Sequence, residues 1–291
     1  MTLAPIMYLN GRFVTADQAV LSPFDRGFLF AHAAYEVTAV LNQRLIDFQP
    51  HVTRLRRTLD QIDIPNPFSD EAWLELHQEL ICRNDFEEGL VYVQVSAGNE
   101  GYRDFAGPER LTPTIFLFAD ARPLIGPMAE HGISAVTLPD TRWLRRDLKT
   151  TQLLSQALAY RQARERGAVT AIMYEQGYVT EAASANVWIV TPEGQLITRN
   201  LGTEILPGIT RAAVTDLLAG ADVPLVEARF SVEALRSASE VFTSSAGALI
   251  APVVSLDGAP IGSGRPGPVT RNIQRLYYDR MGADLGPLSW L

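Results

Sequence analysis

The chain has 291 residues, of which 47% are hydrophobic and 20% charged, and its formal net charge is −8. This composition is that of a soluble globular protein, and the length is sufficient for two domains. The acidic balance and the lack of a basic tract argue against nucleic acid and anionic membrane surfaces as partners.

Cysteine and histidine usage narrows the chemistry further. The single cysteine, Cys82, cannot form an internal disulfide, which fits a reducing compartment. The four histidines are scattered without the spacing of metal ligands, so no metal site is predicted. The N-terminal stretch lacks the regions of a signal peptide, and no apolar run is long enough to span a bilayer. We therefore expect a cytoplasmic protein.

The first 120 residues predict a sheet with two helices. Asn10-Gly11 lies between two alternating runs, which is a strong hairpin signal. The further elements expected in this part are a second pair of β-rich runs around 41–43, helices over 50–63 and 69–84, and strands over 90–98 and 113–120. Ser69 or Asp70 is expected to cap the second helix, because acidic residues fill its first turn.

Residues 121–131 are rich in proline and glycine and are interpreted as a linker. The elements expected after it are a strand over 133–138, a helix over 148–166 with Gly167 as its C-cap, an antiparallel set over 170–198, a helix over 208–221, two strands over 240–261 and a last helix over 269–281.

These elements predict a mixed α/β (α+β) protein of two domains. Residues 1–120 form the smaller N-terminal α/β domain, 121–131 the linker, and 132–291 the larger C-terminal domain. Antiparallel hairpins dominate the pattern, which argues against a doubly wound parallel sheet.

One residue stands out by its rarity. Of the 25 lysines and arginines, only Lys149 is a lysine. Codon usage rich in arginine accounts for the missing lysines but not for the one that remains. Arginine stays protonated, whereas lysine can lose its proton and form a Schiff base with a carbonyl group. Lys149 is therefore the candidate catalytic residue.

A Schiff-base lysine suits pyridoxal 5'-phosphate, which also needs a carboxylate at its ring nitrogen and an anion site for its phosphate. The stretch "TEAASANVW" supplies Glu181, Ser184 and Asn186, and "LIT" and "LPGITR" follow at 196–198 and 206–211. This spaced pattern resembles the signature of the class IV aminotransferases, the fold-type IV pyridoxal-phosphate enzymes. Trp188 stands where that signature has Phe or Tyr.

The resemblance covers nearly the whole chain and looks closest to the D-amino-acid transaminases. It implies that Lys149 forms the Schiff base, Glu181 contacts the pyridine nitrogen and Arg54 holds the phosphate. It further assigns to the cofactor site Ile209 and Thr210 at a helix start, the Ser245 hydroxyl, Leu206 on the ring face, and Ser184 and Asn186. The substrate residues that it implies are Tyr35, Val37, His51 and Arg103.

The resemblance is weaker where the substrate carboxylate is held. D-amino-acid transaminases typically use an Arg-x-His pair on the loop after the strand "VYVQV". Here Arg103 is present, but Phe105 stands at the histidine position if one residue is inserted, and Tyr102 and Asp104 fill the pair if none is. Another arginine, such as Arg26, is an alternative carboxylate ligand.

The function that follows is transfer of an amino group between a D-amino acid, such as D-alanine or D-glutamate, and a 2-oxo acid. An (R)-selective amine transaminase shares the fold and suits an incomplete carboxylate site. A branched-chain aminotransferase is disfavoured by Tyr35, and an aminodeoxychorismate lyase and a non-catalytic anion-binding dimer remain as further alternatives. His32 is unusual, since an Asp-Gly pair is common in its place in the family. By resemblance we expect a homodimer.

Overall fold

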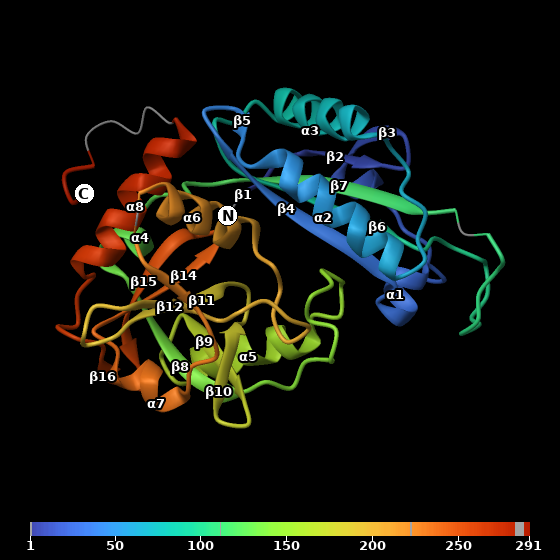
Figure 1. Ribbon diagram of the computed structural model, residues 1–291. Helices are drawn as coiled ribbons and strands as arrows, with labels where there is room; N and C mark the ends of the chain where they lie inside the picture. Colours follow the sequence, from blue (N-terminus) through green and yellow to red (C-terminus); the bar gives the residue numbers. More distant parts are fainter. Residues whose placement is uncertain (1, 111, 222, 283–287) are drawn as a thin grey trace. The chain divides into compact units, whose positions relative to one another are not determined.

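The computed structural model describes residues 2–110, 112–221, 223–282 and 288–291. The chain divides into two compact units (Figure 1). Unit 1 comprises the residues up to Leu124 together with Leu148–Gln152, and unit 2 comprises Ile125–Asp147 together with the residues from Leu153 onward. Each unit has its own sheet and its own helices, which confirms the predicted mixed α/β class.

Unit 1 is built on an antiparallel sheet in the order β3-β2-β7-β6-β4-β5, with β1 beside β7. Its strands are β1 (Thr2–Leu3), β2 (Ile6–Leu9), β3 (Arg12–Thr15), β4 (Ala33–Leu41), β5 (Arg44–Leu45), β6 (Glu88–Ser96) and β7 (Thr114–Ala121). The long strands β4 and β6 pair over nine residues, from Ala33↔Ser96 to Leu41↔Glu88. This pairing fixes which β4 side chains share a face with those of β6.

Two tight turns form where the sequence predicts them. Asn10 has φ 46° and Gly11 has φ 90°, so both occupy the left-handed region that a two-residue hairpin turn requires. Asn42 and Gln43, with φ 51° and 58°, form the turn between β4 and β5 in the same way. Both predicted hairpins are confirmed.

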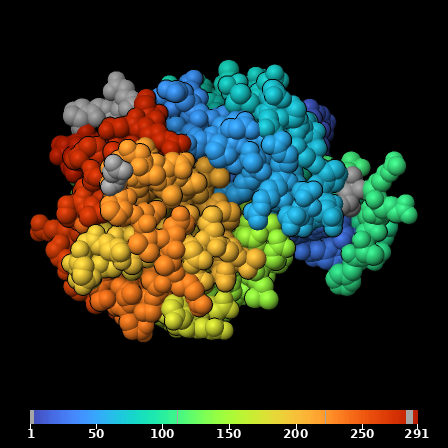
Figure 2. All heavy atoms as spheres, in the orientation of Figure 1, coloured from blue at the N-terminus to red at the C-terminus, as the bar shows by residue number. Residues whose placement is uncertain are grey.

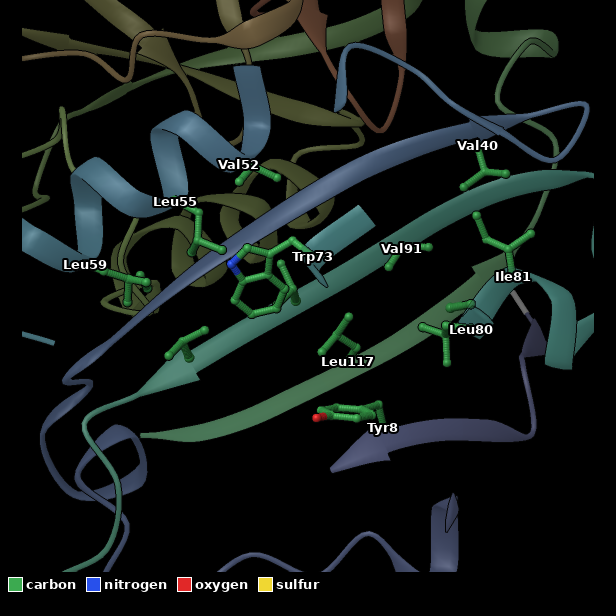
Figure 3. Packing of buried hydrophobic residues seen from close by; sticks show 14 of the residues in the cluster. Tyr8, Val40, Val52, Leu55, Leu59, Trp73, Leu80, Ile81, Val91 and Leu117 are labelled. Carbon is green, nitrogen blue, oxygen red and sulfur yellow. The ribbon is translucent and has the colours of Figure 1, made fainter. Parts of the chain in front are cut away.

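Two helices cover one face of the sheet of unit 1 (Figure 1). The helical elements of the unit are the 3-10 turn η1 (Ala16–Gln18), α1 (Arg26–Phe30), α2 (Phe48–Gln61) and α3 (Asp70–Asn84). Figure 3 shows α2 and α3 packing Leu55, Leu59 and Trp73 against the β-strands, and these three side chains are at most 2% exposed. The Ser69 hydroxyl accepts a hydrogen bond from the Ala72 amide, so Ser69 is the N-cap of α3 as predicted.

Unit 2 is built on a nine-stranded sheet in the order β10-β9-β8-β15-β14-β11-β12-β13, with β16 beside β15. Its strands are β8 (Ile133–Pro139), β9 (Thr170–Glu175), β10 (Tyr178–Ala182), β11 (Asn186–Val190), β12 (Leu196–Thr198), β13 (Leu225–Glu227), β14 (Glu240–Ser245), β15 (Leu249–Leu256) and β16 (Ala259–Pro260). The sheet is mixed, because β8 is parallel to both β9 and β15, and β12 is parallel to β13. The predicted hairpins are present, but the parallel pairs join strands that are distant in sequence and no local pattern indicates them.

The helices of unit 2 are α4 (Pro127–His131), α5 (Leu154–Glu165), α6 (Ile209–Gly220), α7 (Val232–Ser237) and α8 (Pro268–Met281). The unit begins within the stretch 121–131 that was predicted to be a linker, and α4 forms part of that stretch. Neither α4 nor α7 was expected from the sequence, since each is short.

The predicted start of the helix over 148–166 is wrong, because α5 begins at Leu154. Residues before it are extended along β4: the Tyr35 amide donates to the Lys149 carbonyl, and the Thr151 amide donates to the Ala33 carbonyl. These backbone groups therefore serve the sheet of unit 1 and cannot form the first turns of a helix. The predicted end is close, since Arg166 is the C-cap and Gly167 follows in a left-handed conformation with φ 74°.

Neither a membrane-spanning helix nor a metal-binding cluster is found among the described residues. None of the helices there combines the length and the apolar character that crossing a bilayer would require. In the same ranges, His, Cys, Asp and Glu side chains form no cluster of three or more that would bind a metal ion.

Candidate active site

The backbone of Lys149 is fixed in unit 1 by β4. The Tyr35 amide donates to the Lys149 carbonyl at 3.0 Å, and Ala34 and Thr150 form an antiparallel bridge beside it. The Lys149 ammonium lies 4.0 Å from the centroid of the Tyr35 ring, in cation–π geometry. The single lysine of the chain is thus held over a residue that the sequence assigned to the substrate.

Tyr35 begins an aromatic surface that crosses three strands of unit 1. Its ring stacks on Tyr92 of β6, with centroids 5.5 Å apart, and Tyr92 stacks on Phe118 of β7 at 4.8 Å. Val37 pairs with Tyr92 in register and so lies on the same face of β4 as Tyr35. Burial raises the pKa of Tyr92, and its hydroxyl donates to Gln94.

Tyr92 and Gln94 were not predicted as site residues. The alternation within "LVYVQV" is the signal that was available, because it places these two residues on the face opposite the buried valines of β6. Pairing with β4 then puts that face beside Tyr35 and Val37.

The opposite face of β4 carries a buried ionic cluster. Glu36 is 1% exposed and binds Arg54 of α2 through two hydrogen bonds, from Nε at 2.7 Å and from Nη2 at 2.9 Å. The His51 Nδ1 lies 2.8 Å from the second carboxylate oxygen. Arg54 and His51, which the sequence assigned to phosphate and substrate, therefore meet at Glu36, a residue that it left unassigned.

The pKa values within this cluster follow from its charges. Burial by itself would raise the pKa of Glu36, but Arg54 and His51 outweigh it and hold the pKa well below its usual range. Burial lowers the pKa of His51, although Glu36 opposes that change. At neutral pH the cluster thus holds an ionised Glu36 and a neutral His51, whose Nδ1 donates to the carboxylate.

Arg103 lies on an exposed loop, residues 97–110, between β6 and β7. Its guanidinium packs on the rings of Phe30, at 5.3 Å, and Phe105, at 4.6 Å. Arg26, the alternative carboxylate ligand, is only 6% exposed and donates to Glu100 and to backbone carbonyls of the same loop. Its donors serve the protein itself in this structure.

In unit 2 the central residue is Glu181, at the end of β10. It is 4% exposed and accepts hydrogen bonds from Arg142, from the Leu206 amide at 3.2 Å and from the Asn186 side chain at 3.1 Å. Burial raises the pKa of Glu181, the Arg142 charge opposes this, and nearby Asp140 adds to the rise. Arg142 and Asp140 were not predicted, although both lie fewer than ten residues before Lys149 in the sequence.

Asn186 joins Glu181 to the turn that precedes α6. Its side-chain amide donates to Glu181 and, at 2.9 Å, to the Leu206 carbonyl. A Cβ added at Gly208 would lie 2.0 Å from the Asn186 Oδ1, so only glycine fits against that side chain. The spaced motif that links Glu181, Asn186, Leu206 and Gly208 is therefore one hydrogen-bonded unit in three dimensions.

The start of α6 meets the requirements of an anion site. Gly208 is its N-cap, and within the described ranges no side chain caps the amides of Ile209 and Thr210. Arg211 is anchored to Glu227 and to the Arg199 carbonyl, which fixes the first turn. A helix of this length with uncapped N-terminal amides favours a phosphate group.

Two further predicted residues of unit 2 have local partners. The Ser245 hydroxyl, at the end of β14, accepts from the Ala248 amide at 3.2 Å. The Ser184 hydroxyl is exposed and hydrogen-bonds the Tyr160 hydroxyl of α5, so it lies outside the Glu181–Asn186–Leu206 cluster.

The residue types described above are those that a pyridoxal-phosphate enzyme requires. They are the single lysine of the chain, the buried carboxylate of Glu181, and the start of α6, where no side chain fits at Gly208. The sequence family described as amino-transferase class IV matches residues 33–256. The chain belongs to the class IV aminotransferases, which are pyridoxal-phosphate-dependent enzymes. The relationship predicted from the motif is confirmed.

Named relatives agree with this assignment, and solved structures show the same fold. The chain is 35% identical to a D-alanine aminotransferase of Staphylococcus aureus over 92% of this chain and 95% of the relative. It is 32% identical to a D-alanine aminotransferase of Listeria monocytogenes over 97% and 98% of the two chains. A branched-chain amino acid aminotransferase structure from Escherichia coli, 24% identical, matches with a TM-score of 0.88 over 99% of this chain and 98% of that one. A PLP-bound aminotransferase of Mycobacterium tuberculosis, 22% identical, matches with a TM-score of 0.80 over 95% and 98%.

Proposed function

We propose that this aminotransferase is a D-amino-acid transaminase, which moves an amino group between a D-amino acid such as D-alanine or D-glutamate and a 2-oxo acid. The relatives named D-alanine aminotransferase support this choice, because they align over nearly the full length of both chains. The observation that carries the transaminase chemistry is the Glu181 cluster, in which a buried carboxylate is oriented by Arg142, Asn186 and the Leu206 amide.

Each residue of the proposed site has a physical task. Pyridoxal phosphate, when bound, supplies an electron-withdrawing ring that stabilises negative charge at the α-carbon of the substrate. Glu181 presents an ionised oxygen to the ring nitrogen, and the Ile209 and Thr210 amides bind the phosphate. Lys149 anchors the cofactor through its Nζ.

Lys149 then acts as the proton carrier. With the cofactor bound, its Nζ would take the proton from the α-carbon of the donor and would give a proton to the α-carbon of the amino acid formed from the 2-oxo acid. Arg54 is proposed to contact the phosphate, and Glu36 orients its guanidinium by two hydrogen bonds. Leu206, Ser184, Asn186 and Ser245 complete the proposed cofactor site, and Tyr35, Val37, His51 and Arg103 the proposed substrate site.

The proposal includes a cytoplasmic homodimer. Large apolar side chains of unit 1 are exposed, among them Val20 at 76%, Phe28 at 78% and Phe105 at 72%. Exposed apolar groups of this size are typical of surfaces that bind another protein chain. The single cysteine fits a reducing compartment.

A second candidate is an (R)-selective amine transaminase. It is favoured by the loop of Arg103, where the Arg-x-His pair of D-amino-acid transaminases is incomplete with or without an inserted residue, and by Arg26, whose donors bind protein acceptors. A single exposed arginine holds a carboxylate less firmly than a paired site does.

The experiment that separates these functions is a single-turnover reaction of the holoenzyme. D-alanine, L-alanine and (R)-1-phenylethylamine are added separately without a 2-oxo acid, and the absorbance band of the bound cofactor is followed. The proposal expects fast loss of the band with D-alanine alone. Loss mainly with the amine indicates the second candidate, and loss with L-alanine a branched-chain enzyme. The Lys149→Arg variant is the control, and a normal reaction in that variant would refute the role of Lys149.

A further inference from the structure

We propose that Arg26 and His32 form a clasp that holds the loop 97–110 in one conformation and thereby positions Arg103 for substrates that carry a carboxylate. The inference rests on the proposed function for the role of Arg103 but not for the clasp itself. Figure 2 shows this loop standing out from the rest of unit 1. A projecting segment of this kind keeps a fixed shape only if contacts at its base hold it.

Arg26 supplies those contacts. Its Nη1 donates to the Glu100 carboxylate at 2.8 Å and to the Asp104 carbonyl at 2.7 Å, and its Nη2 donates to the Phe105 carbonyl at 2.9 Å. The Arg26 and Glu100 side chains are each 7% exposed, so water does not screen the pair. One guanidinium therefore binds the side chain of Glu100, three residues before Arg103, and the backbone of the two residues that follow Arg103.

His32 orients the guanidinium from the other side. Its Nε2 lies 2.7 Å from the Ile62 carbonyl at the end of α2, and since a carbonyl only accepts, this nitrogen carries the proton. In the neutral ring Nδ1 is then an acceptor, and it receives a hydrogen bond from Arg26 Nε at 3.3 Å. His32, which is unusual for the family, thus connects helix α2 to the clasp.

The loop is shaped to receive Arg26. A Cβ added at Gly107 would lie 3.0 Å from Arg26 Nη1, and Gly107 has φ 75°, so a side chain there would meet both a steric and a conformational cost. The Phe30 ring lies 5.0 Å from the Arg26 guanidinium and 5.3 Å from that of Arg103. The same aromatic side chain is therefore shared by the clasp and by the residue that it positions.

A preorganised loop does not have to be ordered when the substrate binds, which lowers the free-energy cost of binding. Release of the clasp should weaken the binding of carboxylate substrates through the Michaelis constant and leave the proton transfer at Lys149 unchanged. Arg26 is thus a positioning residue that acts through Arg103.

The test uses the holoenzyme and the variants Arg26→Gln, Arg103→Gln and their double mutant, with Arg110→Gln as a matched control on the exposed part of the same loop. Hydrogen exchange of residues 97–110 reports the clasp without reference to activity. We expect exchange to accelerate about tenfold in Arg26→Gln and to stay unchanged in Arg103→Gln and Arg110→Gln. Equal exchange in Arg26→Gln and the native protein would refute the clasp.

Kinetics with D-alanine and pyruvate report the positioning of Arg103. We expect both Arg26→Gln and Arg103→Gln to raise KM on the order of tenfold with kcat within about twofold, and the double mutant to show no further rise. Additive effects would show that Arg26 does not act through Arg103. If the native enzyme reacts with neither substrate, the proposed function fails while the exchange measurement still decides the clasp.

Should Arg26→Gln not fold, Arg26→Lys is the alternative variant. It keeps the charge but loses the planar guanidinium, and an intermediate acceleration of exchange is expected from it.

Discussion

Units 1 and 2 each bury a carboxylate against an arginine. In unit 1 one carboxylate binds an arginine and a histidine, whereas in unit 2 one arginine binds two carboxylates. In unit 1, Glu36 receives hydrogen bonds from Arg54 and His51, and its pKa is well below the usual range. In unit 2, Arg142 is shared between Glu181 and Asp140, and the pKa of Glu181 is raised by burial.

This difference indicates which role each charged residue has. One acid that faces a cation and a histidine is locked into its ionised form, so Glu36 serves to hold Arg54 in place. In unit 2 one cation faces two acids, and Arg142 opposes the rise in the pKa of Glu181 that burial and Asp140 cause. A buried arginine–carboxylate pair thus has a structural role in unit 1, whereas in unit 2 such a pair sets the pKa of Glu181.

The largest effect is expected from removal of the unit 1 acid. In Glu36→Gln, Arg54 loses its buried counter-charge and the neutral His51 loses its carboxylate acceptor, and the free energy of unfolding should fall by about 3–5 kcal/mol. Denaturant unfolding measures this fall. The control is Glu79→Gln on α3, whose pair with Arg83 is about half exposed and should contribute less than about 1 kcal/mol. If the free energy of unfolding falls as little in Glu36→Gln as in Glu79→Gln, the structural role of the Glu36–Arg54 pair is refuted.

His77 sharpens the comparison because it is buried with a backbone partner and no acid in direct contact. Burial lowers its pKa from 6.5 to about 4, and its Nδ1 binds the Trp73 carbonyl. The unfolded state then binds more protons between these pH values, so the stabilisation is complete above pH 6.5 and is lost as the pH falls. The loss should reach about 3 kcal/mol near pH 4.

Unfolding free energies measured at several pH values in the native protein and in His77→Gln isolate this contribution. The variant should lose part of the pH dependence, whereas His131→Gln, at an exposed position, should retain all of it. An identical slope in all three proteins would show that His77 does not remain neutral.

Arg142→Met tests the unit 2 pair directly. Without the cation, the pKa of Glu181 should rise further, because the Arg142 charge opposes the effect of burial. Since Glu181 must be ionised, the acid limb of the pH profile of kcat/KM should move to higher pH by the same amount. Arg145→Met is the control, because Arg145 pairs with Asp147 at the surface. If the acid limb does not move in Arg142→Met, Arg142 does not control the pKa of Glu181.

The smallest effect, and one of opposite sign, is expected from Asp140→Asn. Asp140 competes for Arg142 and its charge raises the pKa of Glu181. Its neutralisation should therefore move the acid limb to lower pH, and by less than Arg142→Met moves it to higher pH. Asp257→Asn, whose acid pairs with Arg236, should leave the profile in place. A shift to higher pH would reverse the assignment of charges in this cluster.

Much of the architecture could be predicted from short stretches of the sequence. The hairpins at Asn10-Gly11 and around Asn42, the cap at Ser69 and the helix after Gly208 depend on turn and capping chemistry within a few residues, and all are present. The parallel pairs of β8 and the late start of α5 depend on partners far away in the chain, and these were missed or predicted wrongly.

The sequence by itself determined the family, because one lysine and a spaced motif of Glu181, Asn186 and Gly208 are discrete chemical requirements that few folds share. Only the tertiary structure revealed Glu36, Arg142 and the Arg26 clasp. An arginine has the same appearance in a sequence whether it faces solvent, a substrate or a buried carboxylate. Burial and the approach of distant chain segments decide which of these it contacts, and therefore what its charge does.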